Sequence, residues 1–80
     1  MRVAVDALFR DAVSERFWHE TQQIVDLPDG GLEVTLQVGE LREVANWVLS
    51  MGAHARVLGP KKLRKMVRDD LRLALVQYDS

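Results

Sequence analysis

The sequence predicts an α+β fold of the ferredoxin-like kind, in which a split β-α-β-β-α-β pattern forms one antiparallel sheet, with an additional helix at the C-terminus. Three observations predict it. Four short segments have the apolar alternation of strands, two segments with helical spacing separate them in the required order, and a third helical segment ends the chain. We expect two helices on one face of the sheet and a polar surface on the other.

The first strand is expected over residues 2–6, because Val3 and Val5 fall on one face of an extended chain. A helix is expected over about residues 10–17. Its inward candidates are Phe9, Ala12, Val13 and Phe17.

A hairpin follows, with strands at residues 21–27 and 32–38. Residues 28–31 read Pro-Asp-Gly-Gly, which favours a turn because proline fixes φ and glycine adopts positive φ. The second strand alternates throughout. Its inward residues are predicted to be Leu32, Val34, Leu36 and Val38.

The second helix is expected over residues 40–51 and a fourth strand over residues 53–58. The helix has a stripe of apolar residues at the spacing of a half-buried face, and Gly52 stands where a left-handed C-cap is expected. Trp47 lies beside this stripe, so we expect it to be at least half buried. The strand residues predicted to face inward are Ala53, Ala55 and Val57.

The remaining polar strand residues should point to the open face of the sheet. They are Arg2, Asp6, Glu33, Thr35, Gln37, His54 and Arg56.

Composition is that of one small globular domain spanning residues 1–80, with 48% hydrophobic and 29% charged residues. The chain has no cysteine, no clear pairing of a nucleophile with a base, and no histidine with a flanking metal-ligand motif. We therefore expect no enzymatic activity, no catalytic residue, no metal site and no cofactor. No apolar run is long enough for a membrane span, so a cytoplasmic location without membrane contact is expected.

Charge is distributed unevenly along the chain. Residues 1–40 hold eight acidic and three basic residues, whereas residues 41–80 hold four acidic and eight basic residues. The last helix opens at Gly59-Pro60, with Pro60 expected at its first position, and runs to about Gln77. Its N-terminal end has a positive dipole, where basic residues are unfavourable unless an anion or an acidic partner is present. The predicted anion-binding residues are Lys61, Lys62 and Arg64.

A helical wheel of the last helix separates three faces. The face predicted to pack on the sheet or the other helices has Leu63, Val67, Leu71, Ala74, Leu75 and Tyr78. The adjacent basic face has Lys61, Arg64, Lys65, Arg68 and Arg72. The third face has the apolar residues Met66, Leu73 and Val76, which a monomer would leave exposed. We expect a homodimer interface formed by Met66, Leu73, Val76, Arg68 and Arg72, and the competing expectation is that this face meets another domain of a longer chain.

Several motifs, in order, match a known pattern. They are Trp18-His19, Asp29-Gly30 with the alternating strand after it, Trp47-Val48-Leu49-Ser50-Met51-Gly52, Val57-Leu58-Gly59-Pro60 and Leu63-Arg64. This set resembles the C-terminal extension, or WCX domain, of WYL-domain bacterial transcriptional regulators, over about residues 3–78. Two departures are Met51, where phenylalanine is commoner, and Gly59, where a longer residue usually precedes the proline.

The resemblance implies a regulatory and dimerisation module in a larger regulator that has an N-terminal winged helix-turn-helix and a central WYL domain. This chain would then be a fragment of the regulator and would contact DNA only through the parent protein. The alternative is a free-standing ferredoxin-like domain that binds a small anionic ligand.

Overall fold

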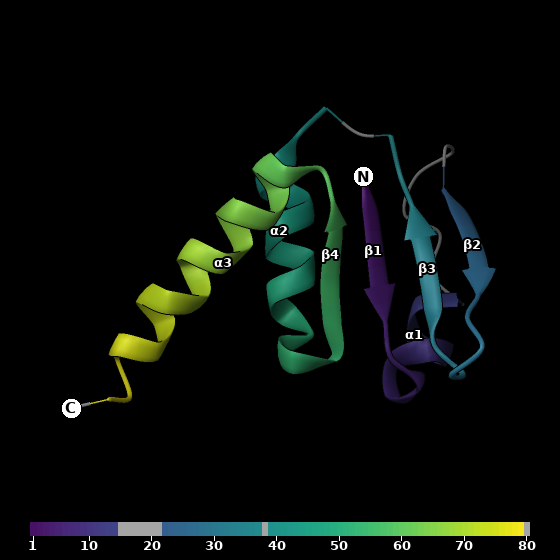
Figure 1. Ribbon diagram of the computed structural model, residues 1–80, viewed down its shortest axis with the longest axis horizontal. Coiled ribbons are helices and arrows are strands. Elements are labelled where there is room, and N and C mark those ends of the chain that lie inside the picture. Colours follow the sequence, from purple (N-terminus) through teal and green to yellow (C-terminus); the bar gives the residue numbers. More distant parts are fainter. Residues whose placement is uncertain (15–21, 38, 80) are drawn as a thin grey trace.

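The chain forms an α+β fold with one four-stranded antiparallel sheet and three α-helices (Figure 1). The computed structural model describes residues 1–14, 22–37 and 39–79. The strands are β1 (Arg2–Val5), β2 (Gln23–Asp26), β3 (Leu32–Thr35) and β4 (Ala55–Gly59), and the helices are α1 (Arg10–Ser14), α2 (Leu41–Ser50) and α3 (Lys61–Val76). The strand order is β2-β3-β1-β4, which leaves β2 and β4 at the edges. The predicted fold class is confirmed at this level.

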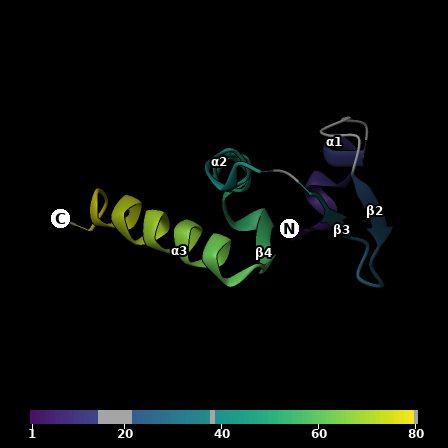
Figure 2. The same cartoon turned by 90° about the horizontal axis from the view of Figure 1, so that it is seen from above.

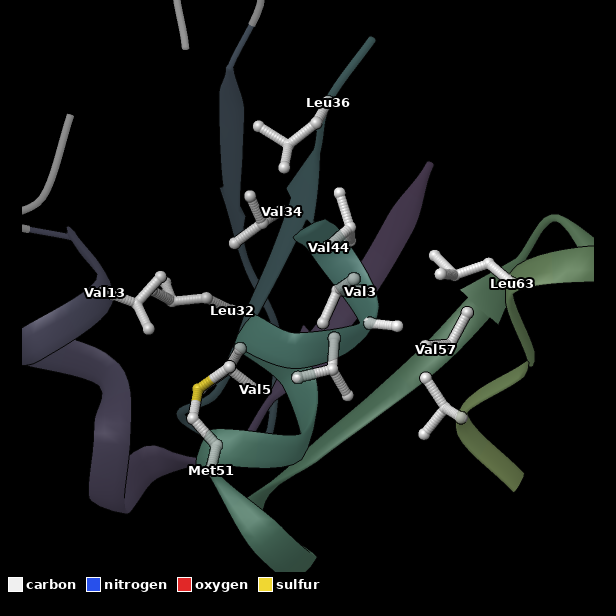
Figure 3. Close-up of a cluster of buried hydrophobic side chains, with 13 residues drawn as sticks. Val3, Val5, Val13, Leu32, Val34, Leu36, Val44, Met51, Val57 and Leu63 are labelled. Carbon is white, nitrogen blue, oxygen red and sulfur yellow. The ribbon is translucent and has the colours of Figure 1, made fainter. Parts of the chain in front are cut away.

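Helices α1 and α2 lie on the same side of the sheet (Figure 2). Helix α3 starts beside the end of β4, contacts both β4 and α2, and then leaves the body of the domain (Figures 1 and 2). The core lies between the sheet and the two helices (Figure 3).

The alternating apolar residues of the strands point into this core, as predicted. The side chains of Val3, Val5, Leu32, Val34 and Leu36 are all buried. From α2, the buried residues are Val44, Ala45 and Val48, and Trp47 packs partly buried against the cluster. The expected burial of Trp47 is therefore confirmed.

Several boundaries differ from the prediction. A 3-10 helix over Gly52–His54 takes up the start of the predicted fourth strand, so β4 begins at Ala55 and Ala53 is exposed. Gly52 has φ +58°, the left-handed conformation expected after α2. Pro60 is the N-cap of α3 and not its first residue.

The first helix is also preceded by a 3-10 helix, over Ala7–Phe9. Val13 is buried and Phe9 packs against the core, but Ala12 is exposed, because it lies on the outer side of the short α1. Phe17, Val38 and the Trp18-His19 motif lie outside the described residues.

Only the first two turns of α3 bury the face that was predicted to pack. Leu63 and Val67 are buried, whereas Leu71 and Leu75 are 48% and 58% exposed and Tyr78 is 85% exposed. Ala74 is exposed as well. The prediction that all six residues pack on the domain is wrong for the last four, because α3 continues past the edge of the sheet.

Gly31 ends the turn between β2 and β3 where two backbone segments lie very close together. A Cβ at this position would lie 2.4 Å from the backbone oxygen of Val5. We expect Gly31→Ala to lower the free energy of unfolding by about 1–3 kcal/mol, because the β1 backbone would have to move. Gly39→Ala is the matched control, since no described residue other than its chain neighbours has an atom within 4 Å of a Cβ there. Urea denaturation measures both, and equal losses would contradict this explanation.

None of the seven residues predicted for the open face is buried. Arg2 pairs with Glu33 across adjacent strands at 3.0 Å, and Nδ1 of His54 lies 2.7 Å from Oδ2 of Asp6. The other carboxylate oxygen of Asp6 accepts a hydrogen bond from the Leu8 N–H, which caps the 3-10 helix. The Arg2–Glu33 pair joins β1 to β3, and the Asp6–His54 contact joins the end of β1 to the residue just before β4.

Asp6 should make the free energy of unfolding of the domain depend on pH. The hydrogen bond from His54, followed by that from the Leu8 N–H, lowers the pKa of the Asp6 carboxyl below its ordinary value of 3.8. A carboxylate with a lowered folded-state pKa stabilises the fold above its ordinary pKa, and this contribution is lost as pH falls through the folded-state pKa. The melting midpoint of Asp6→Asn should therefore fall less steeply than that of the unmodified chain between about pH 5 and pH 2.

Asp11→Asn is the control for this comparison. The Asp11 side chain is exposed and has no partner among the described residues. Its removal should therefore leave the fall of the melting midpoint with decreasing pH unchanged. Identical curves for Asp6→Asn and Asp11→Asn would show that the Asp6–His54 contact has no effect on folding.

Candidate functional site

A groove of about 610 Å³ lies between the edge strand β4 and the first three turns of α3. Its apolar lining consists of Ala55, Val57, Val67 and Leu71. Its basic lining consists of Arg56, Lys61, Arg64, Lys65 and Arg68. The groove therefore combines an apolar floor with positive charge, and the described residues that line it include no acidic residue.

Four of the five basic residues that line the groove have no ion-pair partner among the described residues, and Lys65 is the exception. Arg2, Arg10, Arg42 and Lys65 each form an ion pair, with Glu33, Asp26, Asp70 and Asp69 respectively. Among the described residues, the charged groups of Arg56, Lys61, Arg64 and Arg68 have no carboxylate within ion-pair distance. These four cations without ion-pair partners make the lining of the groove positively charged.

The structure brings together only two of the three residues predicted to bind an anion. Lys61 and Arg64 line the groove, while Lys62 points to a second hollow, beside Arg42 and Asp70. That second hollow already contains carboxylates, so Lys62 belongs to a different electrostatic environment. Anion binding by Lys61, Lys62 and Arg64 stays a prediction, with Lys62 in a different hollow from the other two.

Arg56 is the groove residue that the sequence analysis missed. Arg56 is exposed, as predicted for the open face of the sheet, but it also lines the groove beside residues of α3. Only the packing of α3 along the β4 edge reveals this, because the pairing of a strand with a distant helix has no local sequence signal.

The residues predicted to form an interface divide between two environments. Leu73 and Val76 are 68% and 64% exposed on the overhanging half of α3, and Arg72 is exposed there too. Met66 is partly buried against the core and Arg68 lines the groove. The exposed apolar surface of α3 is thus wider than the predicted strip: it includes Leu71, Leu73, Leu75, Val76 and Tyr78, and we call this set the α3 overhang.

Neighbouring acidic residues of α3 are used in structural contacts. Asp70 pairs with Arg42 of α2, and Asp69 pairs with Lys65 one turn earlier at 2.6 Å. The hydrogen bond from Lys65 lowers the pKa of the Asp69 carboxyl. Within residues 1–14, 22–37 and 39–79, no group of three or more metal-ligating side chains occurs. No helix among the described residues is both long and apolar enough to cross a membrane.

Comparison with protein-family models identifies the family to which this domain belongs. The family model described as the WCX domain matches residues 1–75, which include every strand and nearly all of α3. The chain belongs to the WCX domain family. This membership confirms the resemblance inferred from the Trp47 and Leu58-Gly59-Pro60 motifs, and it links this WCX domain to WYL-type regulators at the level of the family. No match to a curated protein was found.

Proposed function

We propose that this WCX domain is the regulatory and dimerisation module of a bacterial WYL-type transcriptional regulator. In this proposal the chain is one domain of a longer cytoplasmic protein, whose winged helix-turn-helix binds DNA and whose WYL domain precedes the WCX domain. The family match supports the proposal, and the strand order β2-β3-β1-β4 agrees with the ferredoxin-like arrangement expected of it. The module itself has no enzymatic role.

The α3 overhang is the observation that carries the dimerisation role. Its residues extend beyond the sheet into solvent, as Figures 1 and 2 show for the C-terminal half of α3. Five large hydrophobic residues are exposed on two faces of this projecting C-terminal segment, and a soluble monomer rarely keeps so much apolar surface exposed. We infer that a second copy of the domain covers it.

A second copy fits this surface for two reasons. Homo-oligomers are most often two-fold symmetric, so two projecting helices can bury each other's apolar side chains. The basic side chains of α3 can also face the acidic first half of the partner, which would orient the two copies. The competing occupant is the WYL domain of the same chain, which would bury the overhang within one molecule.

A regulator-level experiment tests the proposed function. In the gene, an open reading frame that continues upstream of Met1 into a WYL domain and a winged helix-turn-helix is expected. Removal of residues 73–80 from that regulator should then reduce promoter occupancy in a footprinting assay, because a dimeric regulator binds two half-sites together. A stop codon directly upstream, or unchanged occupancy after the truncation, would contradict the proposal and favour the free-standing anion-binding alternative.

A further inference from the structure

We propose that the groove between β4 and α3 binds an extended acidic polypeptide segment, which adds to the sheet as a fifth strand beside β4. This proposal goes beyond the dimerisation role, because the groove lies along the first three turns of α3 and shares only Leu71 with the overhang. It rests on three features of the described residues: the free edge of β4, the apolar floor of the groove, and the four cations without counter-charges.

The hydrogen-bonding pattern of the sheet identifies which groups of β4 are free. Asp6 donates its N–H to the carbonyl oxygen of His54, and Ala4 pairs with Arg56 two residues further along. Antiparallel pairing alternates, so Arg56 bonds to β1 while the N–H and C=O groups of Ala55 and Val57 point away from it. The pattern on the other side of β1 agrees, because Met1 exchanges both backbone hydrogen bonds with Leu36 of the β3 side.

The free groups of Ala55 and Val57 lie at the groove. Both residues line it, and α3, which starts beside the end of β4, diverges from the strand towards its beginning (Figure 1). An edge strand with unpaired backbone groups is a template for an added strand, and main-chain hydrogen bonds supply affinity in this mode of peptide recognition. Two N–H donors and two C=O acceptors therefore point away from β1, on the side where an incoming strand would pair.

The charge of the groove selects an acidic segment. Arg56 extends from β4 itself, while Lys61, Arg64 and Arg68 come from the facing helix. Carboxylates at alternate positions of an added strand would meet these cations, and apolar residues between them would cover Val67 and Leu71. A single-stranded nucleic acid fits less well, because its bases need aromatic platforms and the described residues that line the groove include none.

Titration of an acidic peptide into the isotopically labelled chain tests the proposal. The probe is a decapeptide of alternating glutamate and valine, with amide hydrogen exchange followed by NMR. The amides of Ala55 and Val57 should exchange at least about tenfold more slowly with peptide bound, whereas Arg56 should change little because its N–H already bonds to β1. The same peptide with N-methyl groups at alternate residues keeps its charge but cannot pair along one edge, so it should bind at least about tenfold more weakly.

Charge variants supply the second test. Arg64→Glu with Arg68→Glu should weaken peptide binding by at least about tenfold, because both side chains line the groove. Lys62→Glu with Arg72→Glu is the matched control: it makes the same change of net charge on the same helix, outside the groove lining, and should change affinity by less than about threefold.

Four results would overturn the proposal. They are no peptide binding, equal binding of the N-methylated peptide, equal weakening by both double variants, and binding of oligothymidylate or inorganic phosphate at the groove without binding of the peptide. Circular dichroism of each variant shows whether it is folded, and a groove variant that fails to fold is replaced by Arg64→Gln with Arg68→Gln, for which the same loss is expected.

Discussion

Replacement of Leu63 by alanine should lower the free energy of unfolding by about 2–5 kcal/mol, whereas Leu73→Ala should change it by less than about 0.5 kcal/mol. The two leucines lie on one helix, ten positions apart in the sequence, but Leu63 is completely buried and Leu73 is 68% exposed. Removal of the Leu63 side chain leaves a cavity between α3, α2 and the end of β4, and the surrounding valines cannot collapse fully into it.

Urea denaturation at low protein concentration measures this difference without a contribution from self-association. Domains of this size are only marginally stable, so Leu63→Ala can unfold the chain outright. Leu63→Met then provides the graded version, with an expected loss below about 1.5 kcal/mol. Similar losses for Leu63→Ala and Leu73→Ala would show that α3 packs along its whole length, in contradiction to the observed overhang.

Leu73→Glu should weaken self-association by at least about tenfold while leaving the fold of the monomer intact. The substitution places a charge within the α3 overhang, and burial of that charge against an apolar partner surface is highly unfavourable. In the monomer the same side chain is exposed to water, so the free energy of unfolding should change by less than about 0.5 kcal/mol.

Leu8→Glu is the matched control for this substitution. Leu8 is 72% exposed, but it lies in the 3-10 helix after β1, at the other end of the domain from the overhang. Size-exclusion chromatography at several loading concentrations should separate the two variants, with only Leu73→Glu eluting later than the unmodified chain. Equal shifts for both variants would indicate nonspecific association through exposed leucines.

The sequence predicted the parts of the fold that depend on local periodicity. Alternation in β1 and β3, the turn at Gly30-Gly31 and the apolar stripe of α2 each correspond to a feature of the structure. The buried face of each of these elements follows from its own residue pattern, so it can be recognised one segment at a time.

Helix α3 shows why the rest could not be predicted. A helical wheel identifies the face on which Leu63, Leu71 and Leu75 lie, but it has no information about how far the opposing surface extends. The sixteen residues of α3 span about 24 Å, whereas the five residues of β4 span about 17 Å. Helix α3 also diverges from β4 (Figure 1), so its second half has no packing surface beside it, and residues with the pattern of a core are exposed.

The groove could be predicted only in part for a related reason. Lys61 and Arg64 follow from their place at the start of a basic helix, but Arg56 joins them through the contact of α3 with β4. The backbone groups of Ala55 and Val57 have no neighbouring strand to pair with because the strand order puts β4, and not β1, at the edge of the sheet. Strand order is a long-range property that residue patterns within single segments do not determine.

Sedimentation equilibrium of the unmodified 80-residue chain tests the central claim, that the α3 overhang is a surface for self-association, most directly. With protein concentration raised from about 1 μM to about 100 μM, the weight-average mass should rise towards twice the monomer mass of 9.1 kDa. Removal of residues 73–80 should hold the mass at the monomer value over the same range. A constant 9.1 kDa for the unmodified chain would contradict the homodimer, and the WYL domain of the parent chain would then be the partner that covers the overhang.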